Sequence, residues 1–141
     1  MRLAAGFAAL AALLSSSLAA QDRDEQIPVL GLEGAEADAC AAIGRITGLA
    51  DTNSFSASLD TSIPVRSYPD EGAAEKERLS RSTIVWLCDH EGRWQGVVYP
   101  SGPYQEIGDC RVSTPIAEPE PYTGPCAYGW VLARNISLIA G

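Results

Sequence analysis

The sequence predicts an all-β domain that is cross-linked by disulfides. From Cys40 onward, short runs of β-branched and aromatic residues alternate with turn residues, which is the pattern of many short strands. The 141-residue chain contains four cysteines, an even number that favours two disulfides in an exported protein. The sequence has neither a long helical pattern nor an internal repeat.

Residues 1–19 are predicted to be a signal peptide. Arg2 precedes an Ala/Leu-rich run, and the small residues after this run suit cleavage near Ala19 or Ala20. The apolar run is shorter than the roughly 20 residues that span a bilayer. We therefore expect a periplasmic or secreted protein with no membrane span.

The composition of residues 20–39 predicts a flexible leader segment that is exposed to solvent. They contain six acidic residues and a single Arg, interrupted by Pro28 and two glycines. The alternative is that the apolar patch at residues 27–30 docks on the domain or on a partner. The whole chain has a formal charge of −8, and the signal contributes only Arg2, so the mature chain is still more acidic. Such a surface repels phosphate groups, which argues against nucleic acid as a partner.

The domain itself is expected over residues 40–141. Residues 43–49 alternate apolar with small or polar residues and predict a half-buried strand. Pro64 cannot donate to a neighbouring strand, so residues 63–66 predict an edge strand. Residues 75–79 predict at most one helical turn. Further strands are expected at residues 55–59, 129–132 and 136–139.

The clearest local signal is a β-hairpin. Residues 84–88 and 93–99 are two β-branched and aromatic runs, joined by turn residues at 89–92. After the hairpin, residues 101–127 form a Pro-rich insertion that favours extended backbone. Cys110 and Cys126 bracket most of this insertion. A disulfide that closes a loop of about 15 residues is worth roughly 3 kcal/mol in the chain-entropy model.

Several short motifs, in order, resemble bacterial Src-homology-3-like (SH3-like) domains. The motifs are Val65-Arg66-Ser67-Tyr68-Pro69, Leu79, the hairpin with Gly92-Arg93-Trp94, Gly129-Trp130-Val131 and Ile136. Two further segments, at residues 44–48 and 122–126, resemble a group of exported bacterial proteins of unassigned function. The resemblance runs from Pro64 to Ile136, about half of the chain.

The resemblance implies a small SH3-like barrel with an extra N-terminal strand and a disulfide-closed insertion, which agrees with the strand pattern. Cys110–Cys126 is the preferred disulfide, which leaves Cys40 to fasten the N-terminal strand to Cys88. Four cysteines allow three connectivities, and the other two stay open. The expected core residues are Ile46, Val65, Leu79, Val85, Leu87, Val97, Tyr99, Val131 and Ile136.

The sequence contains no recognisable set of catalytic residues. His90 is the only histidine, and it lies in a predicted turn, which is a poor platform for a general base. All four cysteines are better explained as disulfide partners than as nucleophiles. The pattern of ligating residues matches no zinc or calcium site. We therefore expect a non-catalytic protein with no catalytic residue, no metal and no cofactor.

SH3-like barrels present an aromatic-lined groove between their loops, which suits peptide ligands. The expected binding surface includes Tyr68, Trp86 and Tyr104, with Trp86 exposed because it alternates with Val85 and Leu87. Expected partners are a peptide, a peptidoglycan stem peptide or an envelope protein, bound by a monomer. Trp94 and Trp130 are expected to be half-buried structural residues.

Two other functions stay open. The segment Ser101-Gly102-Pro103-Tyr104 is similar to the loop motif of periplasmic lysozyme inhibitors, which predicts a secreted inhibitor or immunity-type partner of a hydrolase. The domain could also serve a purely structural role, assembling with itself or with an envelope protein.

Overall fold

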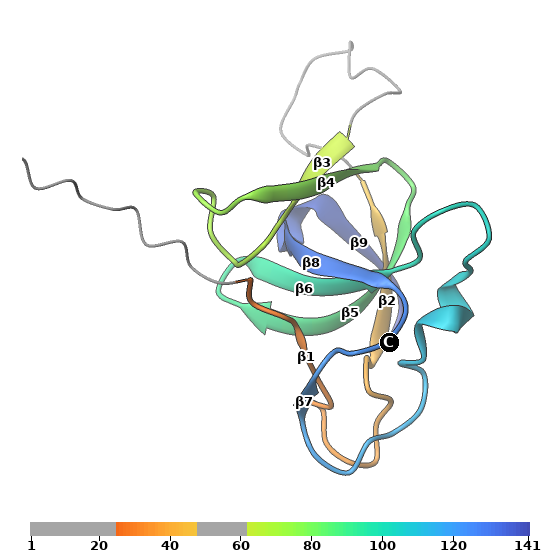
Figure 1. Cartoon of the computed structure of the whole chain (residues 1–141). Helices are drawn as coiled ribbons and strands as arrows, with labels where there is room; N and C mark the ends of the chain where they lie inside the picture. The colour runs from red at the N-terminus through yellow and green to blue at the C-terminus, as the bar shows by residue number, and fades with distance from the viewer. Residues whose placement is uncertain (1–24, 48–61) are drawn as a thin grey trace, which may run out of the picture.

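The computed structural model describes residues 25–47 and 62–141, and the fold over those residues is all-β (Figure 1). The predicted signal peptide and the strand expected at residues 55–59 lie outside the described residues. The strands are β1 Val29–Leu30, β2 Ala42–Ile46, β3 Ser62–Arg66, β4 Glu75–Ser80, β5 Ile84–Glu91, β6 Trp94–Tyr99, β7 Glu120–Pro121, β8 Ala127–Leu132 and β9 Ile136–Ala140. Two short 3-10 helices are η1 Ile107–Cys110 and η2 Ala133–Asn135.

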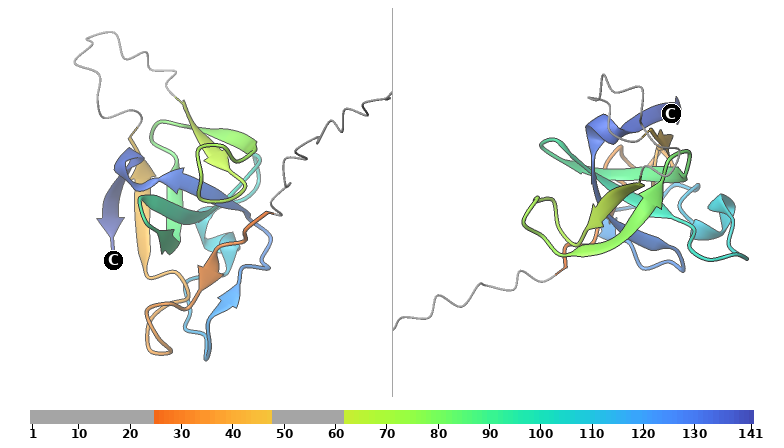
Figure 2. Two further views of the ribbon diagram at one scale, coloured as in Figure 1. Left: turned by 90° about the vertical axis from the view of Figure 1, so that its left-hand side faces the viewer. Right: turned by 90° about the horizontal axis from the view of Figure 1, so that it is seen from above.

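Seven strands form one curled sheet in the order β4-β3-β8-β6-β5-β2-β9, and every pairing in it is antiparallel (Figure 2). Within the described residues no pairing joins β4 to β9, so the sheet is open between these two strands. The strands β1 and β7 form a separate two-stranded sheet beside it.

Two local predictions are corrected by the sheet. The segment with Pro64 is not an edge strand, because β3 lies between β4 and β8. Ladder pairing with β8 is limited to the pair Arg66↔Trp130, so most of that side of β3 forms no ladder that a proline would interrupt. Residues 75–79 belong to strand β4 rather than to a helical turn, because they pair with β3 along its length.

The predicted hairpin is confirmed as β5 and β6, with a tighter turn than expected. Glu91 pairs with Trp94, so only Gly92 and Arg93 form the turn, and β5 continues through His90. Gly92 has a φ of 57°, which glycine adopts at little steric cost. The polar residues 89–91, which predicted a turn, are therefore strand residues at the solvent end of the hairpin.

The inner face of the sheet holds the core that the sequence predicts. The nine expected core residues all belong to it, with Leu87 and Ile136 only partly buried. Ile63 is a further member that the prediction omitted. The two-residue alternation of the strands explains the agreement, because it places every second side chain on the same face.

Tyr99 carries the polar group of this core. Its side chain is 1% exposed, and its phenol donates a hydrogen bond to Glu77 on β4. Burial, and then the hydrogen bond and the negative charge of Glu77, raise the pKa of Tyr99 far above its usual value.

The outer face of the sheet carries a second core that the sequence did not predict. Trp86, Val98 and Tyr122 pack there with both disulfides, and Leu30 and Val112 cover them. The disulfides are Cys40–Cys88 and Cys110–Cys126, the pairs preferred from the sequence. Two disulfides indicate an oxidising compartment.

Residues 26–31 correct the prediction of a solvated leader for this part of it, because they lie against the outer face, whereas residues 32–36 are exposed as predicted. The indole Nε1–H of Trp130 donates to the carbonyl of Gln26 at 2.8 Å, and the amide of Val29 donates to Asp89 Oδ2 at 2.8 Å. Pro28 is fully buried, and it crosses the sheet over Gly96, where an added Cβ would come within 3.0 Å of Pro28 Cβ. The alternative interpretation, docking of residues 27–30 on the domain, is the correct one.

The insertion closes over the same face. The phenol of Tyr122 accepts a hydrogen bond from the Cys126 amide at 2.9 Å and donates one to the Cys110 carbonyl at 3.0 Å, so it bridges both ends of the disulfide-closed loop. A bridge between Asp38 and Pro115 joins the insertion to residues 25–39. Among the described residues, no helix has the length and apolar character needed to cross a membrane.

The two disulfides should differ in their contribution to stability. In the chain-entropy model, the 48-residue separation of Cys40–Cys88 is worth about 4 kcal/mol and the 16-residue separation of Cys110–Cys126 about 3 kcal/mol. We expect the double Cys→Ala variant of the first pair to lower the free energy of unfolding by about 1 kcal/mol more than that of the second. Urea unfolding of both variants measures this, and the reverse order would contradict it.

The raised pKa of Tyr99 predicts a loss of stability in alkali. Above about pH 10 the phenol ionises in the unfolded chain but keeps its proton in the folded protein, so the free energy of unfolding falls as the pH rises. The variant Tyr99→Phe should be less stable at neutral pH by about 1 kcal/mol and should lose stability less steeply above pH 10. Parallel denaturant titrations at pH 8 and pH 11 test this, and equal slopes would show that Tyr99 ionises in the folded state.

Candidate functional site

Trp86 does not belong to an exposed binding surface. Its alternation with Val85 and Leu87 does place it on the outer face, but the insertion covers that face, and the side chain is 8% exposed. Its indole Nε1–H donates to the carbonyl of Ile107 in η1 at 2.8 Å. The strand pattern set the direction of the side chain, and a distant segment then buried it.

The three expected binding residues do not share one surface. Tyr68 is half-buried in the loop that joins β3 to β4, whereas Tyr104 is 96% exposed in the insertion. This loop and the insertion lie at opposite ends of the molecule in Figure 1 and in the view from above in Figure 2. The structure therefore does not bring Tyr68, Trp86 and Tyr104 together on one accessible surface.

A cavity of about 360 Å³ lies on the outer face, beside the β3–β4 loop. It combines apolar walls with a few polar groups, as small-ligand sites do. We call it the Arg66 cavity. Its lining residues are Pro64, Arg66, Glu71, Trp94, Leu132 and Asn135.

The alternation of side chains along β3, β6 and β8 brings the lining residues of the Arg66 cavity to the outer face. Ile63 and Val65 face the inner core, so Pro64 and Arg66, which alternate with them, face outward. Trp94 pairs directly with Leu132 on the neighbouring strand, which makes these two walls one unit. Helix η2 continues from β8 and brings Asn135 to the same place.

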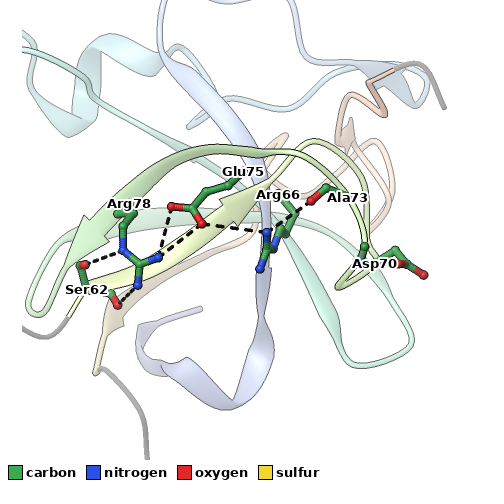
Figure 3. A network of polar contacts seen from close by, with 7 residues as sticks. Ser62, Arg66, Asp70, Ala73, Glu75 and Arg78 are labelled. Carbon is green, nitrogen blue, oxygen red and sulfur yellow. Dashed lines mark hydrogen bonds and ion pairs between the residues drawn. The ribbon is translucent and has the colours of Figure 1, made fainter. Parts of the chain in front are cut away.

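The positive charge of Arg66 is only weakly compensated by the neighbouring carboxylates. Its Nη1 donates to the Ala73 carbonyl at 3.3 Å and lies 4.0 Å from a carboxylate oxygen of Glu75 (Figure 3). Glu75 also pairs with Arg78 at 3.2 Å, so its charge is shared between two guanidinium groups. Glu71, the carboxylate in the cavity wall, pairs with Arg93 at 2.9 Å. The Nε atom of Arg66 is buried and has no hydrogen-bond partner.

Asn135 adds an unsatisfied acceptor to the same cavity. Its side chain is 3% exposed, and its Oδ1 atom has no hydrogen-bond partner. The backbone carbonyl of Asn135 accepts from the Thr47 amide at 2.9 Å, which holds the residue in place. A buried polar atom without a partner costs about 1–3 kcal/mol. Arg66 and Asn135 therefore bring a partly exposed guanidinium group and a buried amide side chain to the wall of one cavity.

Sequence reasoning did not identify this site. Arg66 belongs to the motif that resembles SH3-like domains, and the alternation in β3 places its side chain on the outer face. The outward position of Arg66 could therefore have been inferred from the sequence. Nothing in the sequence distinguishes Asn135, because its burial depends on where η2 returns to the sheet.

The insertion carries a second, shallower hollow of about 530 Å³ at its tip. The Ser101 amide donates to Gln105 Oε1 at 2.8 Å, and Gln105 Nε2 donates to the Pro125 carbonyl at 3.1 Å. These bonds brace the segment that presents Tyr104. Arg111 follows η1 in the left-handed conformation, with a φ of 59°, and also lines the hollow.

The N-terminal end of the docked segment is held by charge and by an aromatic ring. Lys76 on β4 forms an ion pair with Glu25 and lies 3.9 Å from the centroid of the Tyr128 ring. Tyr128 also donates to Glu25 at 3.3 Å. Burial, followed by the charge of Glu25, raises the pKa of Tyr128, and burial raises that of Tyr122.

Metal-ligating side chains do not gather in the part of the chain that the structure describes: no three His, Cys, Asp or Glu residues there lie close enough to hold an ion. His90 is exposed near the end of β5. The comparisons with known proteins gave no match to this chain, whether with a family model, a curated protein or a solved structure.

Proposed function

We propose that this chain is an exported, non-catalytic binding module of the SH3-like type, and that it binds a peptide at the Arg66 cavity. The lining of the cavity suits binding of a ligand: it consists of one cation, one buried amide side chain and apolar walls. Because it brings together no nucleophile with a base, we propose no reaction there.

The observation that carries this proposal is the lining of the cavity, where the partly exposed side chain of Arg66 lies among apolar walls. The backbone carbonyl of a peptide can accept a hydrogen bond from a guanidinium group. The apolar surfaces of Trp94 and Leu132 belong to the same cavity and suit an apolar side chain of the ligand.

Sequence and topology together favour the SH3-like assignment. The Val-Arg-Ser-x-Pro motif forms the end of β3 and the start of the next loop, and Gly129-Trp130-Val131 lies within β8. Short antiparallel strands with period-two burial are the expected elements of such a barrel. Export is supported by the predicted signal peptide and by the two disulfides.

Trp94 makes the first experiment direct, because its indole lines the cavity. Titration of the oxidised protein with purified peptidoglycan stem peptides, and with extended peptides blocked at both ends, should change the tryptophan fluorescence in a saturable way. We expect Arg66→Gln to weaken binding about tenfold or more, since it removes a charge-assisted hydrogen bond.

Arg45→Gln is the matched control. Arg45 is an exposed arginine on β2, and it does not line the cavity. Its loss should leave the affinity unchanged. Equal effects of the two substitutions, or no fluorescence change with any peptide, would refute binding at this cavity.

The exposure of Tyr104 favours a second candidate function, inhibition of a hydrolase such as lysozyme. A fully exposed aromatic ring on a braced, disulfide-framed loop is a common anchor in protein–protein interfaces. The hollow beside it includes Asp109 and Arg111, which offer both signs of charge to a partner.

A lysozyme activity assay tests this second function. If the protein inhibits, we expect Tyr104→Ala to raise the inhibition constant about thirtyfold, the equivalent of about 2 kcal/mol for an anchor residue. Tyr68→Ala, in the β3–β4 loop at the opposite end of the molecule, should leave inhibition unchanged. Lack of inhibition by the intact protein, or inhibition that is indifferent to Tyr104, would refute this role for the loop.

A further inference from the structure

We infer that the free edge of strand β9 pairs with β9 of a second copy of this chain, so that two molecules form a weak antiparallel dimer with Leu138 at its two-fold axis. This inference goes beyond the proposed function, because it concerns a surface other than the Arg66 cavity and the insertion.

Strand β9 is the last strand of the seven-stranded sheet. It pairs with β2 on one side, and no strand of the described residues pairs with it on the other side. The left view of Figure 2 shows β9 at the margin of the molecule. An edge strand of this kind presents backbone N–H and C=O groups with which a further strand can pair.

The hydrogen bonding at the start of β9 indicates which backbone groups face the free edge. The Asn135 carbonyl accepts a hydrogen bond from the Thr47 amide at 2.9 Å, so the backbone of Asn135 faces β2. Backbone groups alternate in direction along an antiparallel strand, so Ser137 also faces β2 and Leu138 faces away from it. Leu138 therefore offers both an N–H and a C=O group at the free edge.

The side chain of Leu138 extends the inner core to this edge. Leu138 pairs with Gly44, and Gly44 pairs with Val85, so these three residues form one row across the sheet. Val85 is buried in the inner core, and directly paired residues lie on the same face. Leu87 and Ile136, which flank the position where Gly44 lacks a side chain, are only partly buried, and Leu138 is 64% exposed. The inner core is therefore incompletely covered at the β9 edge.

The charges on the two edges of the sheet favour a second β9 as the strand that covers this edge. Strand β9 contains no charged residue, whereas β4, the other edge, contains four in a row at residues 75–78. Charged side chains on an edge hinder pairing, and opposite β9 they would lie against the apolar Leu138 and Ile139. The chain as a whole has a formal charge of −8, so two copies repel each other over much of their surface. The uncharged β9 edge is where they can approach at the lowest electrostatic cost.

Antiparallel pairing about a two-fold axis at Leu138 uses both of its outward-facing groups. Opposite residues in a hydrogen-bonded pair exchange two N–H···O bonds, so each Leu138 is donor and acceptor to the other. The arrangement is closed, because both β9 edges are then paired and the β4 edges that remain are charged. Association therefore stops at two copies.

The shortness of β9 makes this dimer weak. Five residues on each copy are few beside the ~20–30 residues a side of a standard interface. We expect a dissociation constant of roughly 10 µM to 1 mM. The monomer expected from the sequence is then the form present at low concentration.

Sedimentation equilibrium of the oxidised protein, from about 1 µM to about 2 mM, tests the association. The apparent mass should rise from that of one copy towards that of two. Amide hydrogen exchange over the same concentrations locates the contact. Exchange at Leu138 should slow as the concentration rises, whereas exchange at Ser137, which faces β2, should not depend on concentration.

A charge at the two-fold axis should break the dimer. Leu138→Lys places two ammonium groups opposite each other, and we expect the dissociation constant to rise at least about tenfold. Leu32→Lys is the matched control, because Leu32 is also an exposed leucine, lies in the loop after β1 and belongs to no strand. It makes the same change in net charge and should leave the dimer intact.

Four results would overturn the inference. They are a chain that stays monomeric over the whole concentration range, a dimer in which exchange at Leu138 is independent of concentration, equal effects of the two lysine substitutions, and assemblies that grow beyond two copies. A monomer whose β9 edge pairs only with a strand of another protein falls under the first. The concentration series uses the unaltered protein, so it stands even if Leu138→Lys fails to fold.

Discussion

Burial of both faces of β6 is the constraint on which this structure depends. Val97 and Tyr99 face the inner core, whereas Trp94, Gly96 and Val98 face outward, and all five are buried. A single antiparallel sheet normally leaves one face to water. Here the outer face is covered by residues 25–39 and by the insertion, both of which are tied to the domain by disulfides.

The segments that cover the outer face leave part of it open, and the candidate site lies in this open part. Val98 lies under the second core, Gly96 lies under Pro28, and Trp94 opens into the Arg66 cavity. A site built on paired strands is rigid, which suits recognition by a few fixed polar atoms. The buried atoms Arg66 Nε and Asn135 Oδ1, which have no hydrogen-bond partner, should each cost the folded protein about 1–3 kcal/mol.

The two candidate surfaces are independent of each other. The Arg66 cavity includes Glu71 of the β3–β4 loop, whereas Tyr104 belongs to the insertion at the opposite end of the molecule. One small ligand cannot contact both. A partner protein held at Tyr104 would therefore leave the cavity accessible, and the two proposed functions can be examined separately with single substitutions.

The inner core and the β5–β6 hairpin could be predicted from the sequence, because they depend on the two-residue alternation of strands. The disulfide pairs agree with the preferred ones, but four cysteines allow three connectivities, and the tertiary structure decided among them. Alternation also placed Arg66 and Trp86 on the outer face. The packing of distant segments set what that face meets: Trp86 is buried by η1, residues 25–30 are docked, and Asn135 is brought to Arg66 by the return of the chain through η2. The periodicity of a strand indicates which face of the sheet a residue lies on. The segment that covers this face comes from elsewhere in the chain, and a local sequence pattern contains no information about so distant a contact.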